Sequence, residues 1–552
     1  MAASEAKPDQ DEAIKAVFKR FDADQSGNVD VSELGWLAVS SVGTFVLGDI
    51  NDRFFLRRTA AVKADLNETV QTLKRQAEAA LEVGKGQLVD SSGGVLDVHA
   101  SIKRARLQNG DVLVLHIGRV QVQATRAAFA AVLGDGSVET WGDADFGGDS
   151  SAVQDQLNHV KQIQASAFAF AAILGDGSVV TWGDADFGGD SSAVQDQLNN
   201  VKQIQATASA FAAILGDGSV VTWGDAACGG DSRAVQDQLN NVKQIQATAF
   251  AFAAILGDGS VVSWGSWGDV MAVDISEVQD QLKNVQQIQT TESAFAAILG
   301  DGSVVTWGDV PNGGACWLTD QLKHVRQIQA SDIAFAAILG DGSVQTWNNP
   351  DMDCVVVQDQ LKNVQHIQAT AAACAAILGS ASVVTWGDED YGGDSSAVRD
   401  QLQNVQQIQA TSGAFAAILV DGSVVTWGDA DCGGDSSAVQ DQLRNVQQIQ
   451  AARGRDGDSG AFAAILGDGS VVTWGASEAG GDSKAVQDQL RNVQQIQATD
   501  SAFAAILGDE SVVTWGGARY GGDRCVVQEE AEEQEEEEEE EEEEDTHEED
   551  QE

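Results

Sequence analysis

Residues 201–224 decide the fold and read VKQIQATASAFAAILGDGSVVTWG. Related stretches recur along the chain, and each ends in a tryptophan. Ten such tryptophans follow one another at intervals of 41, 41, 41, 43, 40, 39, 41, 47 and 41 residues, namely Trp141, Trp182, Trp223, Trp264, Trp307, Trp347, Trp386, Trp427, Trp474 and Trp515. A near-constant period of this length is typical of a repeat architecture. The chain therefore contains ten copies of one small structural unit.

Each unit predicts three β-strands, of which the second and third form a hairpin. The hairpin is expected because Asp-Gly between β-rich runs supplies the positive φ angles of a two-residue type I′ turn. Eight units keep Asp-Gly at this place, whereas Ser380-Ala381 and Asp509-Glu510 replace it in the other two. Those two hairpins are expected to have weaker turns.

Both faces of the hairpin strands are predicted to be buried, because Ala-Phe-Ala-Ala-Ile-Leu and Val-Val-Thr-Trp lack the alternation of a sheet with one wet face. Small sheets stacked radially or along a solenoid would bury both faces. We therefore predict a mainly β chain, with a β-propeller of about ten short repeats over residues 119–527. Because ten units exceed the usual four to eight blades, the sequence leaves open a ten-blade ring, a smaller ring with leftover units and an open spiral.

The motif Asp-Gly-Ser-Val-Val-Thr-Trp-Gly is followed by a glycine five residues after the Trp-Gly pair, as in Trp182-Gly183 and Gly188. In this the unit resembles the regulator-of-chromosome-condensation repeat. The resemblance implies a β-propeller with short three-stranded blades, and a role in protein interaction, in guanine-nucleotide exchange or in association with chromatin. The family's Gly and His before the second strand are replaced by Thr207 and Phe211. We therefore rank nucleotide exchange below scaffolding.

Giant HECT-type ubiquitin ligases carry repeats of this kind, which makes a ubiquitin-pathway adaptor or subunit the alternative function. Fewer than 40 residues follow Trp515, and more than half of them are acidic. That length leaves no room for a catalytic ligase domain. We find no nucleophile-and-base arrangement, phosphate loop or kinase signature, so we expect the protein not to be an enzyme.

The segment 1–48 contains a pattern of oxygen ligands that resembles the calcium loop of an EF-hand. Hard Ca²⁺ prefers six to eight oxygen ligands, and this loop type provides them at fixed positions with a glycine at the sharp turn. The turn glycine is Gly27, and the predicted ligands are Asp22, Asp24, Ser26, the Asn28 carbonyl, Asp30 and a bidentate Glu33. Ca²⁺ is accordingly the predicted cofactor.

Residues 49–118 resemble a ubiquitin-like β-grasp domain of the α+β class. Thr69 can cap a helix whose Val70, Leu73, Ala77 and Leu81 line one face, and residues 112–116 alternate as a final strand. The first strand is expected at 54–56 or 45–47, and the second at 60–64. A docking module is favoured over a ligand of ubiquitin receptors.

The charge of the chain restricts its partners. Asp and Glu number 85 against 32 Lys and Arg, for a formal net charge of -53. This charge repels phosphate backbones and favours cations or basic proteins, so we expect a protein partner and no direct nucleic acid. Residues 528–552 hold 19 acidic residues and no Lys or Arg, and such a run cannot bury enough apolar area to fold. We predict that this tail is disordered.

The location of the protein is expected to be cytoplasmic, with the nucleus as the alternative. The six cysteines form no Cys-x-x-Cys pair, which fits a reducing compartment. No apolar run reaches the roughly 20 residues of a membrane span, so no membrane contact is expected. The sequence does not indicate an oligomeric state.

The loops after the third strand are rich in Asp and Gly, as in residues 184–191 (DADFGGDS). Gathered on one rim, they would form a carboxylate-rich face that attracts a basic protein or weakly bound Ca²⁺, although solvated loops are the simpler interpretation. Cys228 and Cys432 occupy the slot that holds Phe146, Phe187 and Tyr391 in sister loops. We expect them to be packing substitutions.

The calcium loop gives the first testable prediction. Glu33→Gln removes the bidentate carboxylate and should abolish the one strong Ca²⁺ site per chain, because bidentate oxygen ligation completes such a site. Titration calorimetry of the wild-type and variant proteins measures this directly. Undiminished binding heat in Glu33→Gln would show that the loop is not the site.

Overall fold

The computed structural model describes residues 36–40, 46–48, 60, 62, 64, 66–81, 85–90, 94–108, 111–116, 118–267, 271–272, 275–314, 322–347, 354–454, 459–523 and 525–526. They form two compact units. One comprises the residues up to Val120 together with Leu133–Ser137, and the other comprises Gln121–Val132 and the residues from Val138 onward. Within this described part of the chain, no helix has the length and apolar character needed to cross a membrane.

The N-terminal unit contains helix α2 and a four-stranded sheet. The elements are α2 (Val70–Leu81), β1 (Trp36–Ser40), β2 (Val46–Gly48), β3 (Gln87–Val89) and β4 (Val112–His116). The strand order is β2-β1-β4-β3, and every pairing is antiparallel.

Helix α2 is built as the sequence predicted. The Oγ1 atom of Thr69 accepts a hydrogen bond from the backbone N–H of Thr72 at 3.2 Å, which satisfies one of the free N–H groups at the helix start. The predicted apolar face, Val70, Leu73, Ala77 and Leu81, is buried in one cluster with residues of the sheet.

The first strands of this sheet match the prediction only in part. Strand β1 lies before residue 49 and pairs with β4. The predicted segment 45–47 overlaps β2, and the alternative 54–56 lies outside the described residues. The described residues of 60–64 lie outside strands, and Ala60 and Ala64 pack against the core. The reason is that a short strand is selected by its partner across the sheet more than by its own β-propensity. The resemblance to ubiquitin stays a prediction.

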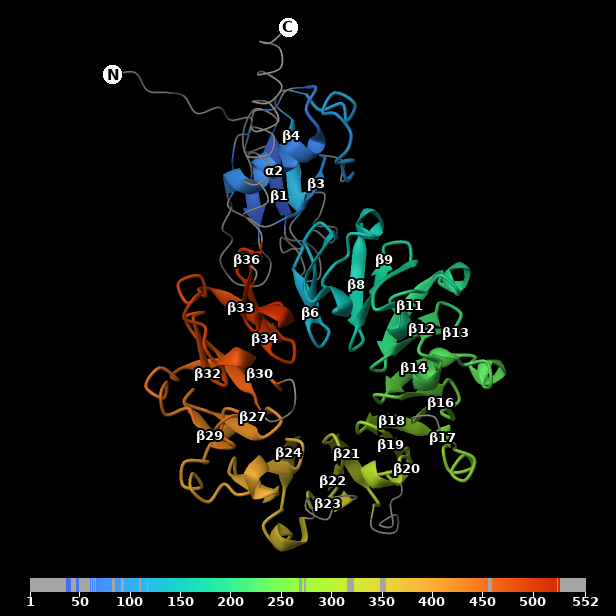
Figure 1. Ribbon diagram of the computed structural model, residues 1–552, viewed down its shortest axis with the longest axis vertical. Coiled ribbons are helices and arrows are strands. Elements are labelled where there is room, and N and C mark those ends of the chain that lie inside the picture. Colours follow the sequence, from blue (N-terminus) through green and yellow to red (C-terminus); the bar gives the residue numbers. More distant parts are fainter. Residues whose placement is uncertain are drawn as a thin grey trace, which may run out of the picture. The chain divides into compact units, whose positions relative to one another are not determined.

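The second unit consists of ten antiparallel sheets, which we call blades 1 to 10 in chain order (Figure 1). Blades 1 to 5 are β5 Gln121–Ala124, β6 Ala128–Val132, β7 Val138–Gly142; β8 Val160–Ala165, β9 Ala169–Leu174, β10 Val179–Gly183; β11 Val201–Ala206, β12 Ala210–Leu215, β13 Val220–Gly224; β14 Val242–Ala247, β15 Ala251–Leu256, β16 Val261–Trp267, with β17 Met271–Ala272 as a fourth strand; and β18 Val285–Thr290, β19 Ala294–Leu299, β20 Val304–Gly308. Blades 6 to 10 are β21 Val325–Ala330, β22 Phe335–Leu339, β23 Val344–Trp347; β24 Val364–Ala369, β25 Ala373–Leu378, β26 Val383–Gly387; β27 Val405–Ala410, β28 Ala414–Leu419, β29 Val424–Gly428; β30 Val446–Ala452, β31 Ala461–Leu466, β32 Val471–Gly475; and β33 Val493–Ala498, β34 Ala502–Leu507, β35 Val512–Gly516, with β36 Cys525–Val526 as a fourth strand. The prediction of ten repeated three-stranded units is confirmed.

The second and third strands of each blade are largely buried on both faces, as predicted. In blade 3, all of β12 except Leu215 is buried, as is β13 except its last residue. Phe211 stacks on Trp223 with their ring centroids 5.3 Å apart. Equivalent pairs in nine blades have centroid separations of 5.1 to 5.4 Å, whereas blade 7 pairs Cys374 with Trp386. Nine of the ten blades therefore have their own aromatic core.

A tryptophan–glycine hydrogen bond joins neighbouring blades. The Nε1–H group of Trp223 donates to the carbonyl of Gly188 in the loop of blade 2 at 3.1 Å. Gly188 has a φ of 100° and lies so close to the ring of Phe211 that a Cβ atom would be 2.6 Å from it. Only glycine therefore fits this position. The same bond is made by Trp182, Trp264, Trp427, Trp474 and Trp515.

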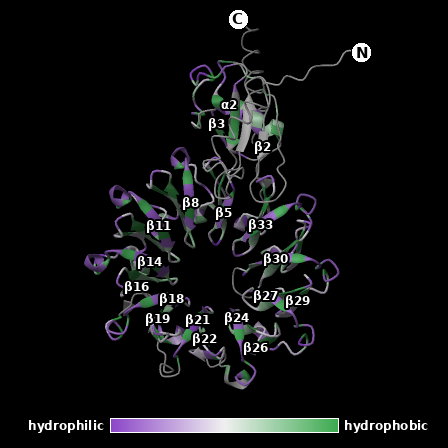
Figure 2. Cartoon of the chain, turned by 180° about the vertical axis from the view of Figure 1, so that it is seen from behind, coloured by the Kyte–Doolittle hydropathy of each residue, from purple (hydrophilic) through white to green (hydrophobic). Residues whose placement is uncertain are grey.

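The turns between first and second strands close the blades into a ring. The first strands lie on the inner side of this ring (Figure 2). In the turns, the backbone N–H of Ala167 donates to the carbonyl of Ala208 in the next blade at 3.0 Å. At the other end of the series, the N–H of Asp500 in blade 10 donates to the carbonyl of Arg126 in blade 1 at 3.1 Å. Of the arrangements left open by the sequence, the structure has the propeller-like ring of ten blades.

The hairpin turn differs from the predicted type I′. In blade 3, Gly218 has a φ of 82°, whereas Asp217 has no positive φ. The N–H of Gly218 donates to the Leu215 carbonyl at 3.0 Å, and the N–H of Leu215 donates to the Ser219 carbonyl at 2.9 Å. This is a three-residue loop that ends in a left-handed glycine. The carboxylate of Asp217 supports it by accepting the Ser219 N–H and Oγ–H at 2.9 and 2.7 Å.

The two turns without Asp-Gly give a second prediction. Ala381 and Glu510 occupy the glycine position with φ values of 61° and 68°, and an L-residue in this region costs roughly 1–2 kcal/mol. Ala381→Gly and Glu510→Gly should each raise the free energy of unfolding by about 1 kcal/mol, measured by urea denaturation. As a control, Ala376→Gly in β25, where φ is not positive, should lower it. An equal loss in Ala381→Gly would refute the turn argument.

Candidate functional site

The loops that follow the third strands lie at the same end of the blades as the turns between first and second strands. In blade 3, the N–H of Asp225 donates to the carbonyl of Ser209 in such a turn at 2.9 Å, and the Thr207 Oγ1–H donates to the carbonyl of Cys228 at 3.1 Å. We use the term loop face for the surface made by residues 143–149, 184–190, 225–231, 388–394, 429–435, 476–482 and 517–523. The only Lys or Arg in these loops is Arg519.

In the loop 184–190, the first and the last aspartate, Asp184 and Asp190, shape the backbone. The carboxylate of Asp184 accepts the N–H of Asp186 at 3.0 Å and caps a short 3-10 turn. The carboxylate of Asp190 accepts the N–H of Ser192 at 2.8 Å, and this hydrogen bond lowers the pKa of Asp190. Hydrogen bonds of this kind favour the charged form. The first and last carboxylates are therefore structural as well as charged.

The middle acidic residue of these loops has a different position. Asp145, Asp186, Asp390 and Asp431 are exposed, and each follows the capping aspartate by two residues. Their backbone N–H groups are held by the cap, whereas their carboxylates extend into solvent. In these four loops a fixed backbone thus presents an exposed middle carboxylate, and the last aspartates Asp149, Asp190 and Asp435 are exposed as well.

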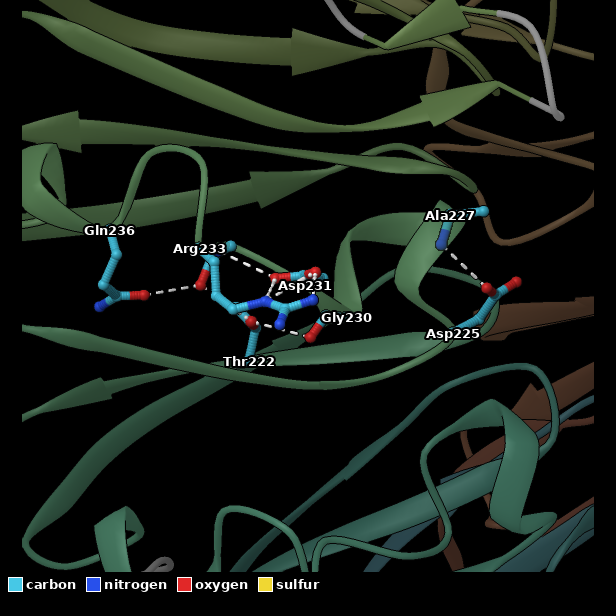
Figure 3. A network of polar contacts seen from close by, with 8 residues as sticks. Thr222, Asp225, Ala227, Gly230, Asp231, Arg233 and Gln236 are labelled. Atoms are coloured by element: carbon cyan, nitrogen blue, oxygen red, sulfur yellow. Dashed lines mark hydrogen bonds and ion pairs between the residues drawn. The ribbon is translucent and has the colours of Figure 1, made fainter.

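A buried chain of hydrogen bonds holds the loop against its sheet in blades 1, 2, 3, 8 and 9, and Figure 3 shows blade 3. In blade 3, Thr222 Oγ1–H donates to Ser232 Oγ at 3.0 Å, and the Ser232 hydroxyl donates to Gln236 Oε1 at 2.8 Å. The Gln236 Nε2–H then donates to the carbonyl of Val220 at 3.0 Å. Since buried hydroxyls without partners cost free energy, this chain fixes the loop. Our sequence analysis missed it, although Ser and Gln follow Trp141, Trp182, Trp223, Trp427 and Trp474 at the same two distances.

Charged residues gather where the turns meet around the inner edge of the ring. Arg453 lies in the insertion that lengthens one repeat interval to 47 residues, and its Nη1 atom is 3.0 Å from Asp332 Oδ1 in blade 6. Asp500 lies beside Arg126 at the junction of blades 10 and 1. Burial raises the pKa of Asp500 to about 6, although Arg126 and Arg453 act in the opposite direction.

The loop cysteines are packing residues, as expected. Cys228 and Cys432 are buried, and desolvation raises the pKa of Cys228 to about 11 and also raises that of Cys432. A nucleophilic cysteine needs a lowered pKa. These thiols are therefore unreactive parts of the loop core.

The predicted calcium ligands Asp22, Asp24, Ser26, Asn28, Asp30 and Glu33 lie outside the described residues, as does the predicted tail 528–552. Among the residues that the structure describes, no group of three or more His, Cys, Asp or Glu side chains is arranged to hold a metal ion. The loop-face aspartates are thus spaced as separate charges, which leaves the basic-protein interpretation of this face as the one to develop.

Asp500 gives a third prediction. Its pKa is raised above the ordinary value of 3.8, so the folded state holds this proton more tightly than the unfolded chain does. The free energy of unfolding that protonated Asp500 contributes is fully present below about pH 4, and it is lost as the pH rises through about 6. Asp500→Asn should therefore stabilise the protein at pH 7 by about 1–2 kcal/mol, and the gain should shrink on acidification.

The measurement is the difference in unfolding midpoint between Asp500→Asn and the wild-type protein from pH 4 to pH 7. Asp186→Asn, which removes an exposed charge from the loop face, is the matched control. A difference for Asp500→Asn that does not change with pH would contradict the assignment.

No family model matches the chain, and no curated protein matches it. Among solved structures, Prp20p from Saccharomyces cerevisiae is similar at 14% identity with a TM-score of 0.30, over 69% of this chain and 86% of that chain. Yeast RCC1 (Prp20) bound to Kap60 is similar at 14% identity with a TM-score of 0.31, over 60% of this chain and 87% of that chain. The CRINKLY WD40 ectodomain of the Arabidopsis thaliana receptor kinase ACR4 is similar at 16% identity with a TM-score of 0.27, over 47% of this chain and 93% of that chain. At these values the likenesses assign no function to this chain.

Proposed function

We propose that this protein is a calcium-binding, non-enzymatic interaction scaffold whose loop face binds a basic protein. The observation that carries the proposal is the set of exposed carboxylates on loops fixed by buried hydrogen bonds. Asp145, Asp186, Asp390 and Asp431 are exposed members of this set. Groups that are already held in place lose less conformational entropy on binding. These loops are therefore preorganised to bind a partner protein.

Charge supports the same interpretation. With a net charge of -53, the chain attracts cationic partners at long range, and this attraction weakens as salt shortens the Debye length. The loop face concentrates such charges, with Arg519 as the only cation in its loops. The calcium part of the proposal is supported by the ligand pattern at residues 22–33.

The test is the binding of a labelled polylysine peptide to the full chain, measured by fluorescence anisotropy at several salt concentrations. The triple variant Asp145→Asn, Asp186→Asn, Asp431→Asn should weaken binding several-fold and reduce its salt dependence. The charge-matched control is Asp155→Asn, Asp196→Asn, Asp237→Asn, which neutralises exposed aspartates in the short turns that precede the first strands. Equal effects of the two triple variants would reject the loop face as the binding surface.

A further inference from the structure

A cavity of about 460 Å³ lies between the loops of blades 7 and 8. Its walls include Glu389, Asp390 and Tyr391 from the blade 7 loop and Gly413, Asp429 and Cys432 from blade 8. All of these residues belong to the described ring.

The cavity exists because two aromatic side chains are missing. At the equivalent place between blades 1 and 2, the rings of Phe146, Phe168 and Phe187 lie one against the next, with centroids 5.2 and 4.7 Å apart. In blade 8, Gly413 replaces Phe168 and Cys432 replaces Phe187. The remaining ring, Tyr391 in the place of Phe146, becomes one wall of an open space.

The walls select the charge of a ligand. Three carboxylates line the cavity, and no Lys or Arg is among the described residues that do so. The Asp429 carboxylate accepts the N–H of Asp431 at 2.8 Å, which fixes its orientation. Burial raises the pKa of Cys432, so its neutral thiol makes an apolar floor.

The walls also select the size of the ligand. The described acidic residues are not arranged as metal ligands, so a compact divalent ion is a poor fit. A larger planar cation can lie against the Tyr391 ring and donate to the carboxylates at the same time. Guanidinium combines flatness, weak hydration and several donors in one plane, whereas an ammonium group is a compact and strongly hydrated charge.

We propose that the cavity between the loops of blades 7 and 8 binds the guanidinium group of an arginine side chain from the partner protein. The inference rests on the proposed function, because it names one residue type that the basic partner supplies. It adds a discrete pocket to what would otherwise be a diffuse electrostatic attraction.

The probe is N-acetyl-arginine-N-methylamide, whose single guanidinium prevents binding at several loops at once. Its affinity for the full chain is measured by saturation-transfer NMR at low salt, beside the citrulline and lysine analogues. The arginine compound should bind, the neutral citrulline compound should not, and the lysine compound should bind several-fold more weakly. Equal binding of arginine and lysine would overturn the assignment to guanidinium.

Variants separate the cavity from the general charge of the face. Cys432→Phe restores a ring that sister loops already carry and should reduce arginine binding about tenfold while every carboxylate remains. Glu389→Gln with Asp390→Asn should do the same while the cavity remains open. Asp155→Asn with Asp196→Asn removes equal charge from the short turns outside the loop face and should change binding less than twofold.

Tyr391→Leu is the second variant, in case Cys432→Phe folds poorly, because it keeps an apolar side chain at the wall and removes the π face. It should weaken arginine binding several-fold, with an unchanged unfolding midpoint. Wild-type affinity in both Cys432→Phe and Tyr391→Leu would overturn the cavity proposal and leave the loop face intact if polylysine still binds it. Equal effects of the two triple variants on polylysine binding, in the preceding test, are the separate failure of the proposed function.

Discussion

Six of the ten blades share one interaction that ties them to the preceding blade, in which a tryptophan indole donates to a glycine carbonyl in that blade's loop. The indole is also stacked on a phenylalanine of its own sheet, so one side chain belongs to two blades at once. In blade 2, Trp182 stacks on Phe170 and donates to Gly147 of blade 1 at 3.0 Å. The glycine cannot be replaced, because a Cβ atom at Gly147 would lie 2.7 Å from the Phe170 ring. Buried area, a hydrogen bond and a steric limit thus act at the same place.

This interaction explains why the loops can vary without loss of the ring. The residue before the critical glycine is Phe187 in one loop, Cys228 in the next and Tyr391 in another, and the backbone path of the loop is kept. Variation at this slot changes only what the loop exposes or encloses. A hollow between two blades can therefore arise from two substitutions, as at Gly413 and Cys432, while the neighbouring sheets stay packed.

The junction of blades 10 and 1 is held by a different combination of contacts. The indole N–H of Trp141 is buried and has no hydrogen-bond partner among the described residues. Instead, the Asp500 N–H reaches the Arg126 carbonyl, and an Arg519 Nη2–Asp143 Oδ2 contact of 3.3 Å joins residues 376 positions apart. The exposed ion pair contributes little, so closure relies mainly on backbone hydrogen bonding and on the packing of Gly521 beside Phe129.

The sequence by itself determined the number of units, their three strands, the burial of both hairpin faces and the apolar face of helix α2. These follow from local periodicity, since side-chain spacing within a few residues decides which face is apolar. The tertiary structure decided ring closure, the hairpin loop type, the strand order of the N-terminal sheet, the Thr-Ser-Gln chain and the cavity beside Tyr391. Each of these depends on atoms that are distant in sequence, or on the space left by two side chains at once, such as Gly413 and Cys432. The repeat pattern does not predict that these two substitutions lie side by side, because each of them alone is an ordinary change of a loop residue.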